Sequence, residues 1–279
     1  MFEINGETKH LGIIGYPVEH SYSPKMHNYI SQIIGKNYVY SAYTVKKENL
    51  TEAIAAIRAL GFSGMNITAP YKVEVMKHLD VLSEKVRLFG SVNTVVNKDG
   101  KLYGYTTDAD GFYMSLKRKG FRVEGKDVLI LGAGGAAKPV IALFAMEGAK
   151  SITVINRTRE NSLKMAEFVL DATGFKIDCD IKLSHYDLVV NTTPLGMYPN
   201  IDTAPEFDIS LVDEKSFVAD MIYNPEETIF LNEAKKTGAV TLNGLGMLIY
   251  QGIMAYEFFT DTKLPEDIFD KILKDVFNK

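Results

Sequence analysis

The sequence predicts an α/β protein built of two domains. Its 279 residues exceed one average domain, which has roughly 100 to 200 residues. Short apolar runs with strand-like composition alternate with amphipathic, helix-like segments along the chain. A glycine-rich turn at residues 132–137 separates two such segments and belongs to a second alternating series. These three observations favour two α/β domains with a cleft between them.

The first hundred residues predict a β-α-β pattern. Strands are expected at residues 11–16, 38–45 and 64–68, and helices at residues 24–34 and 48–60. Ser23-Pro24 and Thr68-Ala69-Pro70 indicate helix starts, because a hydroxyl can cap free N–H groups and proline lacks an N–H. Asn97-Lys98-Asp99-Gly100 lies between two β-rich runs, so residues 91–105 are expected to form a hairpin.

From residue 127 the series becomes a compact succession of strand, glycine turn, helix and strand. Strands are expected at residues 128–131, 151–155, 187–191, 217–220 and near 240, and helices at residues 135–147, 245–259 and 265–277. We expect the last helices to return to the first domain. Residues 1–105 and 244–279 would then form one domain, and residues 106–243 the other.

The glycine turn carries the most specific motif. Gly132-Ala133-Gly134-Gly135-Ala136-Ala137 follows an apolar strand and precedes a helix, which satisfies the G-x-G-x-x-G/A fingerprint of dinucleotide-binding domains. The glycines let the backbone turn tightly and approach a pyrophosphate, whose charge suits the start of a helix. Pro139 places that helix start close to Gly135, since only the first helical N–H groups lack partners. The alternative is a tight turn without a ligand.

The end of the following strand discriminates between the two nicotinamide cofactors. An acidic residue there binds the ribose 2′-hydroxyl of NAD, whereas a 2′-phosphate calls for arginine. This chain has Asn156-Arg157-Thr158 with Arg159 after it, and both guanidinium and hydroxyl groups suit phosphate. The sequence therefore predicts NADP, and surface arginines in a loop are the alternative.

Polar side chains follow several expected strands of the first domain, where an α/β sheet forms its binding crevice. They lie in Ser21-Tyr22-Ser23, Asn66 to Lys72, Asn93-Thr94 and Thr107-Asp108. So many neutral donors and acceptors suit a polyhydroxylated ligand. Lys72 is expected in the first turn of a helix, where the dipole disfavours a cation, so we interpret it as an ammonium aimed at a reacting oxygen. Taken singly, these residues are equally explained as helix caps, turn residues and a solvated lysine.

Composition excludes several classes of function. A net charge of −4 disfavours nucleic-acid binding, and no apolar run approaches the ~20 residues of a membrane span. Cys179 is the single cysteine, which excludes an intrachain disulfide and favours the cytoplasm. The five histidines form no close pair with ligand spacing, so no metal is expected. We expect a small-molecule enzyme, monomeric or homodimeric, that reduces a carbonyl by hydride and proton transfer.

The ordered motifs resemble those of the shikimate dehydrogenase family along essentially the whole chain. Besides the glycine turn and residues 156–158, the matching segments are Gly15-Tyr16-Pro17-Val18, His20 to Pro24, Asn66 to Lys72, Ser91 to Thr94, Thr106 to Asp108, Asn191 to Met197, Asp220 to Pro225, Gly244 to Met247 and Gln251. The resemblance implies a Rossmann-like NADP-binding domain and NADPH-dependent reduction of 3-dehydroshikimate to shikimate, on the route to chorismate and the aromatic amino acids.

The resemblance also implies roles for single residues. Lys72 and Asp108 would be the catalytic pair, in which Asp108 orients the ammonium that protonates the substrate oxygen. The substrate's carboxylate and hydroxyls would be held by Ser21, Ser23, Asn66, Thr68, Asn93, Tyr223 and Gln251, with Asp108. The cofactor would be bound by Gly132, Ala133, Gly134, Gly135, Ala136, Asn156, Arg157, Thr158, Met221, Gly244 and Glu84.

One position departs from the family pattern. Members often carry a basic residue three positions after the Thr158 equivalent, whereas this chain has Asn161, and Arg159 could compensate. Two other readings stay open: a quinate/shikimate dehydrogenase with broader substrate or NAD use, and a non-catalytic ligand-binding regulator on the same fold.

Overall fold

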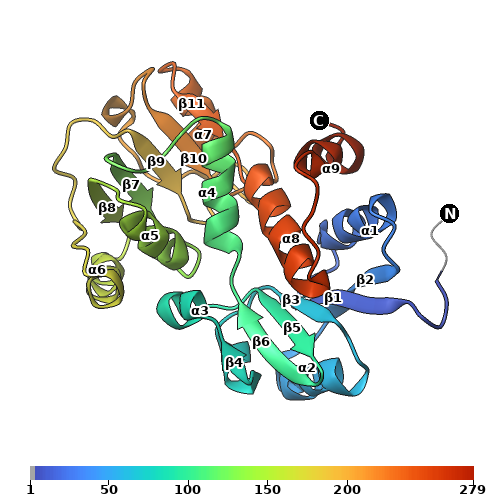
Figure 1. The fold of residues 1–279 in the computed structure, drawn as a ribbon. Helices are drawn as coiled ribbons and strands as arrows, with labels where there is room; N and C mark the ends of the chain where they lie inside the picture. Colours follow the sequence, from blue (N-terminus) through green and yellow to red (C-terminus); the bar gives the residue numbers. More distant parts are fainter. Residues whose placement is uncertain (1–3) are drawn as a thin grey trace. The chain divides into compact units, whose positions relative to one another are not determined.

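The computed structural model describes residues 4–279, which form two compact α/β units (Figure 1). The first unit comprises the chain up to Thr107 together with Ile249–Lys279, and the second is Asp108–Leu248. The chain therefore leaves the first unit once and returns to it inside the helix α8 (Leu245–Thr260). The predicted α/β class and the Rossmann-like second domain are confirmed.

The first unit is built on a mixed six-stranded sheet. Its strand order is β2-β1-β3-β5-β6-β4, in which β2, β1 and β3 are parallel and β3, β5 and β6 are antiparallel. The strands are β1 (Lys9–Gly15), β2 (Tyr38–Thr44), β3 (Gly64–Ile67), β4 (Val81–Leu82), β5 (Thr94–Lys98) and β6 (Lys101–Tyr105). The expected hairpin is present, and Asp99 and Gly100 both have the positive φ that a two-residue turn of type I′ demands.

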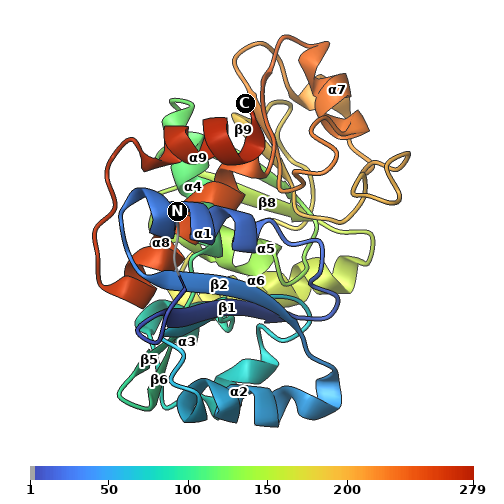
Figure 2. The ribbon, with the colours of Figure 1, turned by 90° about the vertical axis from the view of Figure 1, so that its right-hand side faces the viewer.

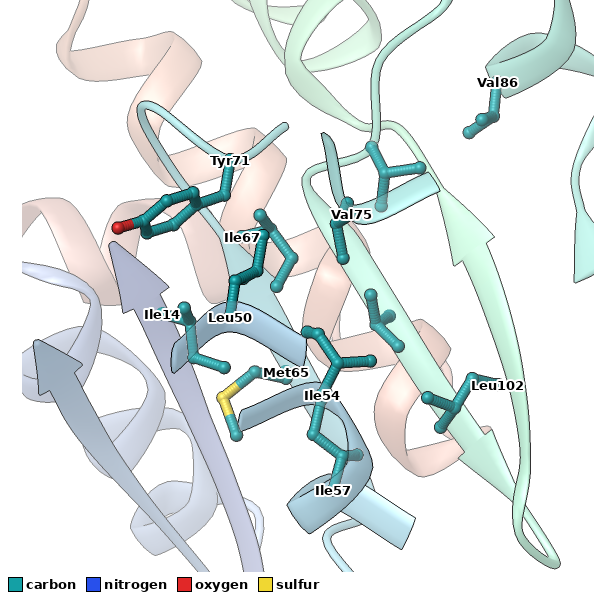
Figure 3. Packing of buried hydrophobic residues seen from close by; sticks show 12 residues of the cluster. Ile14, Leu50, Ile54, Ile57, Met65, Ile67, Tyr71, Val75, Val86 and Leu102 are labelled. Atoms are coloured by element: carbon teal, nitrogen blue, oxygen red, sulfur yellow. The ribbon is translucent and has the colours of Figure 1, made fainter. Parts of the chain in front are cut away.

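Helices cover both faces of this sheet, with α1 and α2 on opposite sides (Figure 2). The helices of the first unit are α1 (Ser23–Ile33), α2 (Leu50–Ala59), α3 (Glu84–Phe89), α9 (Ile268–Phe277) and the second part of α8. Leu50, Ile54 and Ile57 share one face of α2, as residues four and three apart must, and pack on Ile14 and Ile67 of the sheet (Figure 3). This core fixes the sheet edge at which β1 and β3 end.

The second unit contains a five-stranded sheet that is entirely parallel. Its order is β11-β10-β9-β7-β8, so the chain reverses direction across the sheet between β8 and β9, next to β7. The strands are β7 (Asp127–Leu131), β8 (Ser151–Ile155), β9 (Leu188–Asn191), β10 (Phe217–Asp220) and β11 (Val240–Leu242). Ligands of open parallel sheets bind at the carboxyl ends of strands where the order reverses. The glycine turn, directly after β7, lies at that point.

The helices of the second unit are α4 (Asp108–Arg118), α5 (Ala137–Met146), α6 (Arg159–Thr173), α7 (Ile229–Lys235) and the first turn of α8. Helix α5 begins two residues after Gly135, which agrees with the helix start that Pro139 predicted. A core cluster joins β7, β9 and β10 to α7 through Leu129, Val189, Val218 and Phe230.

Two local predictions are wrong. Lys72 does not lie in the first turn of a helix, because the residues after Pro70 form turns and the next helix is the short 3-10 segment Glu74–His78. The helix-dipole argument for Lys72 therefore fails. Ser23 is the first residue of α1 rather than its cap, and the side chain of the cap residue Tyr22 makes no capping hydrogen bond.

Candidate active site

The predicted substrate residues of the first unit gather where three strands meet one edge of the sheet. Asn66 is near the end of β3 and pairs with Thr94, the first residue of the antiparallel β5. Thr94 in turn pairs with Tyr105 at the end of β6. Asn93 precedes β5 and Thr107 follows β6, so opposite strand directions bring all of these polar residues to the same edge.

Asn93 is the centre of a buried hydrogen-bond network. Its amide nitrogen donates to Thr107 Oγ1 at 2.9 Å and to Gln251 Oε1 at 3.5 Å, and its oxygen accepts from the Thr107 backbone N–H at 2.9 Å. Thr107 Oγ1 also donates to the Gln251 carbonyl at 3.1 Å. The structure thus brings Asn93 and Gln251 together, and Thr107 holds α8 against the sheet.

Asn66 joins this network from β3. Its amide nitrogen donates to the Asn93 carbonyl at 3.0 Å and to Thr94 Oγ1 at 3.2 Å. Its oxygen accepts from the phenol of Tyr40 at 2.7 Å. Sequence reasoning missed Tyr40, which lies two residues after Tyr38 on β2 and is buried.

The hydroxyl residues lie after β1 and β3, two parallel neighbours whose carboxyl ends share an edge. The Ser21 hydroxyl accepts from the Ser23 backbone N–H at 3.2 Å, so the two serines are locked in one turn. Ser23 is buried and Ser21 is half-buried. Thr68 follows β3 directly, and its backbone N–H donates to the carbonyl of Ile14 in β1.

Lys72 is half-buried and lies beside the Asn93 network. Its backbone carbonyl accepts from Val92 N–H at 2.8 Å, one residue before Asn93. Asp108, the first residue of α4, belongs to the second unit but directly follows Thr107 in the chain. The pairing of Lys72 with Asp108 stays a prediction. So does a cofactor role for Glu84, the exposed first residue of α3 in the first unit.

In the second unit, the glycine turn presents backbone donors to a ligand. Gly134, Gly135 and Ala136 are exposed, and within residues 4–279 their N–H groups have no hydrogen-bond acceptor. Gly132 has a φ of +108°, and a Cβ on it would lie 2.6 Å from Thr192 Oγ1, so only glycine suits this position. Three free N–H groups before a helix start make a concave donor set for a phosphate.

The end of β8 is tied to the glycine turn. Asn156 Oδ1 accepts from Ala133 N–H at 3.2 Å, and its amide nitrogen donates to the Thr158 carbonyl at 2.9 Å. Arg157 is exposed and makes no ion pair within the described part of the chain. Arg159, in contrast, forms a bidentate ion pair with Asp180, in which Nε donates to Oδ1 at 3.3 Å and Nη2 donates to Oδ2 at 2.7 Å. Arg157 is therefore the guanidinium available for a 2′-phosphate, and the idea that Arg159 compensates for Asn161 loses support.

Met221 and Gly244 also come together. Gly244 N–H donates to the Ile222 carbonyl at 2.8 Å, and a Cβ on Gly244 would lie 2.1 Å from the Met221 carbonyl oxygen. Met221 follows Asp220, a fully buried carboxyl at the end of β10 whose structural role sequence reasoning missed. Asp220 accepts from Ile222 N–H, Thr228 Oγ1 and Asn191 Nδ2 at 2.7–3.1 Å, while burial raises its pKa. Tyr223, two residues after Met221, is half-buried.

Among the described residues, no three His, Cys, Asp or Glu side chains lie together as a metal site would require. In the same part of the chain, every helix is too short or too polar to cross a membrane.

Models of three domains of one enzyme family match the chain in sequence order. The shikimate dehydrogenase substrate binding domain matches residues 13–95, and the shikimate/quinate 5-dehydrogenase domain matches residues 115–194. The shikimate 5′-dehydrogenase C-terminal domain matches residues 244–274. These matches fall on both units.

Individual proteins agree with the family models. The NADP-dependent shikimate dehydrogenase of Methanocaldococcus jannaschii is 43% identical, over 97% of this chain and 100% of its own. A solved shikimate dehydrogenase in complex with NADP+ has a TM-score of 0.91 at 41% identity, over 99% of this chain and 97% of its own. The Listeria monocytogenes shikimate 5-dehydrogenase, solved with shikimate and NAD, has a TM-score of 0.90 at 35% identity, over 97% and 98%.

Proposed function

Because the chain belongs to the shikimate dehydrogenase family, we propose which of its residues perform the NADP-dependent reduction of 3-dehydroshikimate to shikimate. The chain is an NADP-dependent oxidoreductase of the shikimate pathway, and the observation that carries this function is its similarity to NADP-dependent shikimate dehydrogenases over nearly its full length. In this proposal the first unit supplies most of the substrate residues, with Asp108 and Tyr223 from the second unit, and the second unit supplies the cofactor residues apart from Glu84. A cytoplasmic location and a monomeric or homodimeric state stay predictions.

Two observations within the second unit support the binding of NADP there. The free N–H groups of Gly134, Gly135 and Ala136 suit the pyrophosphate, and the unpaired guanidinium of Arg157 suits the 2′-phosphate. We assign Asn156 and Thr158 to the same ribose phosphate, and Met221 with Gly244 to the nicotinamide side. When bound, NADPH supplies the hydride of the reaction.

On the substrate side, the polar edge of the first sheet suits a polyhydroxylated acid. We assign Ser21, Ser23 and Thr68 with the Asn66, Asn93 and Gln251 network to the ligand's carboxylate and hydroxyls, and Tyr223 to a further contact. Hydroxyls and amides can match such a ligand group by group, because each buried polar group of the ligand needs a partner.

Lys72 is the proposed acid. Arrival of the hydride on the carbonyl carbon places negative charge on the carbonyl oxygen, which an ammonium stabilises and then protonates. One 3-dehydroshikimate, one NADPH and one proton thus give one shikimate and one NADP+. Asp108 is the second proposed catalytic residue, as the carboxylate that orients this ammonium.

The role of Lys72 can be tested by following NADPH absorbance with 3-dehydroshikimate. Lys72→Ala should lower kcat by about 100- to 10,000-fold and leave the KM for 3-dehydroshikimate within a few-fold. Lys77→Ala is the matched control, because Lys77 is exposed and, among residues 4–279, its ion pair is with the neighbouring Glu74. A near-normal kcat in Lys72→Ala would remove Lys72 from the chemistry.

A further inference from the structure

Tyr40 lies at the centre of the substrate side without being one of the predicted contacts. Its side chain, on β2, is 2% exposed, and its hydroxyl donates to Asn66 Oδ1 at 2.7 Å. One face of the ring stacks on the fully buried His27 of α1, with ring centroids 4.2 Å apart and an interplanar angle of 10°. The ring is thus held on one face and its hydroxyl is aimed at a predicted ligand contact.

The hydrogen bonds of Asn66 fix which way its amide faces. The Asn93 carbonyl can only accept, so the group 3.0 Å from it must be the Asn66 nitrogen. The second N–H of that nitrogen donates to Thr94 Oγ1 at 3.2 Å. The oxygen of Asn66 therefore faces Tyr40, and both amide protons are already used.

This arrangement limits what Asn66 can offer a ligand. An amide oxygen has two lone pairs, and Tyr40 occupies one of them. Asn66 can accept a hydrogen bond from a ligand hydroxyl through the other lone pair, but it has no proton left for a carboxylate. The orientation that Tyr40 and Asn93 impose on Asn66 therefore favours a ligand hydroxyl, which can donate a hydrogen bond, over a carboxylate, which can only accept one.

We propose that Tyr40 is a positioning residue of the substrate site, which orients Asn66 as an acceptor for a substrate hydroxyl. The inference rests on the proposed function, because it takes Asn66 as a contact of 3-dehydroshikimate. Tyr40 itself does not touch the reacting atoms in this role, so its loss affects substrate binding rather than chemistry.

The direct test is Tyr40→Phe, which keeps the ring and its stacking on His27 but removes the hydroxyl. The KM for 3-dehydroshikimate should rise about 3- to 10-fold, the effect of losing one hydrogen bond. The kcat and the KM for NADPH should stay within about twofold, since neither depends on Asn66 orientation. An unchanged KM for 3-dehydroshikimate would overturn the proposal.

Tyr256→Phe is the matched control for a general loss of stability. Tyr256 is also a buried phenol of the first unit, and its hydroxyl lies 2.9 Å from Ser31 Oγ rather than from a predicted ligand contact. Thermal unfolding should show that both variants are folded, while only Tyr40→Phe changes the KM for 3-dehydroshikimate. If the KM for 3-dehydroshikimate rose equally in Tyr256→Phe, the effect of Tyr40→Phe would reflect a structural role alone.

A double-mutant cycle separates action through Asn66 from independent effects. Asn66→Ala should raise the KM for 3-dehydroshikimate, and adding Tyr40→Phe should change it by less than about twofold further. If the rise in the KM for 3-dehydroshikimate in the double variant equalled the product of the two single rises, Tyr40 would not act through Asn66. A wild type that does not oxidise NADPH with 3-dehydroshikimate refutes the proposed function, whereas an active wild type with a normal Tyr40→Phe variant refutes only the role of Tyr40.

Discussion

The buried His27 makes the stability of the protein depend on pH in a predictable way. His27 is 0% exposed, and neither ring nitrogen has a hydrogen-bond partner among the described residues. The rings of Tyr40, Tyr256 and Phe259 lie next to it, and no hydrogen-bond acceptor or carboxylate among the described residues compensates an imidazolium for its lost hydration. Burial therefore lowers its pKa from 6.5 to about 3, so the folded protein keeps this imidazole neutral.

The sign and size of the effect follow from proton linkage. Between the two pKa values only the unfolded chain binds the proton. The contribution of His27 to the free energy of unfolding is therefore complete above pH 6.5 and is lost as the pH falls towards the pKa of the folded protein. With these values, lowering the pH from about 7 to about 5.5 costs about 1.3 kcal/mol of unfolding free energy through this one residue.

Urea unfolding at several pH values, followed by circular dichroism, measures this contribution. His27→Leu replaces the imidazole with an apolar side chain that cannot be protonated. The variant should lose about 1.3 kcal/mol less than the wild type between pH 7 and 5.5, because all other titrating groups are shared. If both proteins lose stability in parallel over this range, the imidazole of the wild type does not stay neutral.

Three further outcomes are expected. Gly132→Ala should destabilise the protein by about 2 kcal/mol or more and raise the KM for NADPH, since its φ is +108° and its Cβ would meet Thr192; an unaltered Tm would contradict this. Arg157→Gln should raise the KM for NADPH about 10- to 100-fold and leave that for NADH unchanged, whereas Arg159→Gln, whose guanidinium is already paired, should have little effect. Asp220→Ala should lower the unfolding free energy, measured by urea unfolding, by about 3 kcal/mol or more, because three buried donors lose their acceptor. A clearly smaller loss would contradict this expectation.

Long, regular segments could be predicted from the sequence because their apolar spacing depends only on local geometry. The strands β8 and β10 occupy the predicted residues, and the buried face of α2 follows from its spacing. The two-residue strand β4 and the six-residue helix α3 are too short to show a period. The local structure at Lys72 could not be predicted, because a hydroxyl followed closely by proline is typical of turns as well as helix starts.

For the candidate site, the types of residue could be predicted but not their partners. Asn66 and Asn93 stand out as amides at strand ends, yet the bond from Asn66 to Tyr40 spans 26 residues and depends on which strands pair. Alternation along β2 predicts only that the Tyr40 ring points to one face. Likewise, the sequence presents Arg157 and Arg159 as equals, and only the position of Asp180 shows which one is already paired.

The most direct measurement is the initial rate of NADPH oxidation with 3-dehydroshikimate, with NADH and quinate as the competing cofactor and substrate. The purified protein should turn over 3-dehydroshikimate with a kcat/KM for NADPH at least about tenfold above that for NADH, as a free guanidinium facing a 2′-phosphate requires. NADPH absorbance that stays constant in the presence of 3-dehydroshikimate, or equal use of NADH, would contradict the assignment of the two units to this substrate and this cofactor.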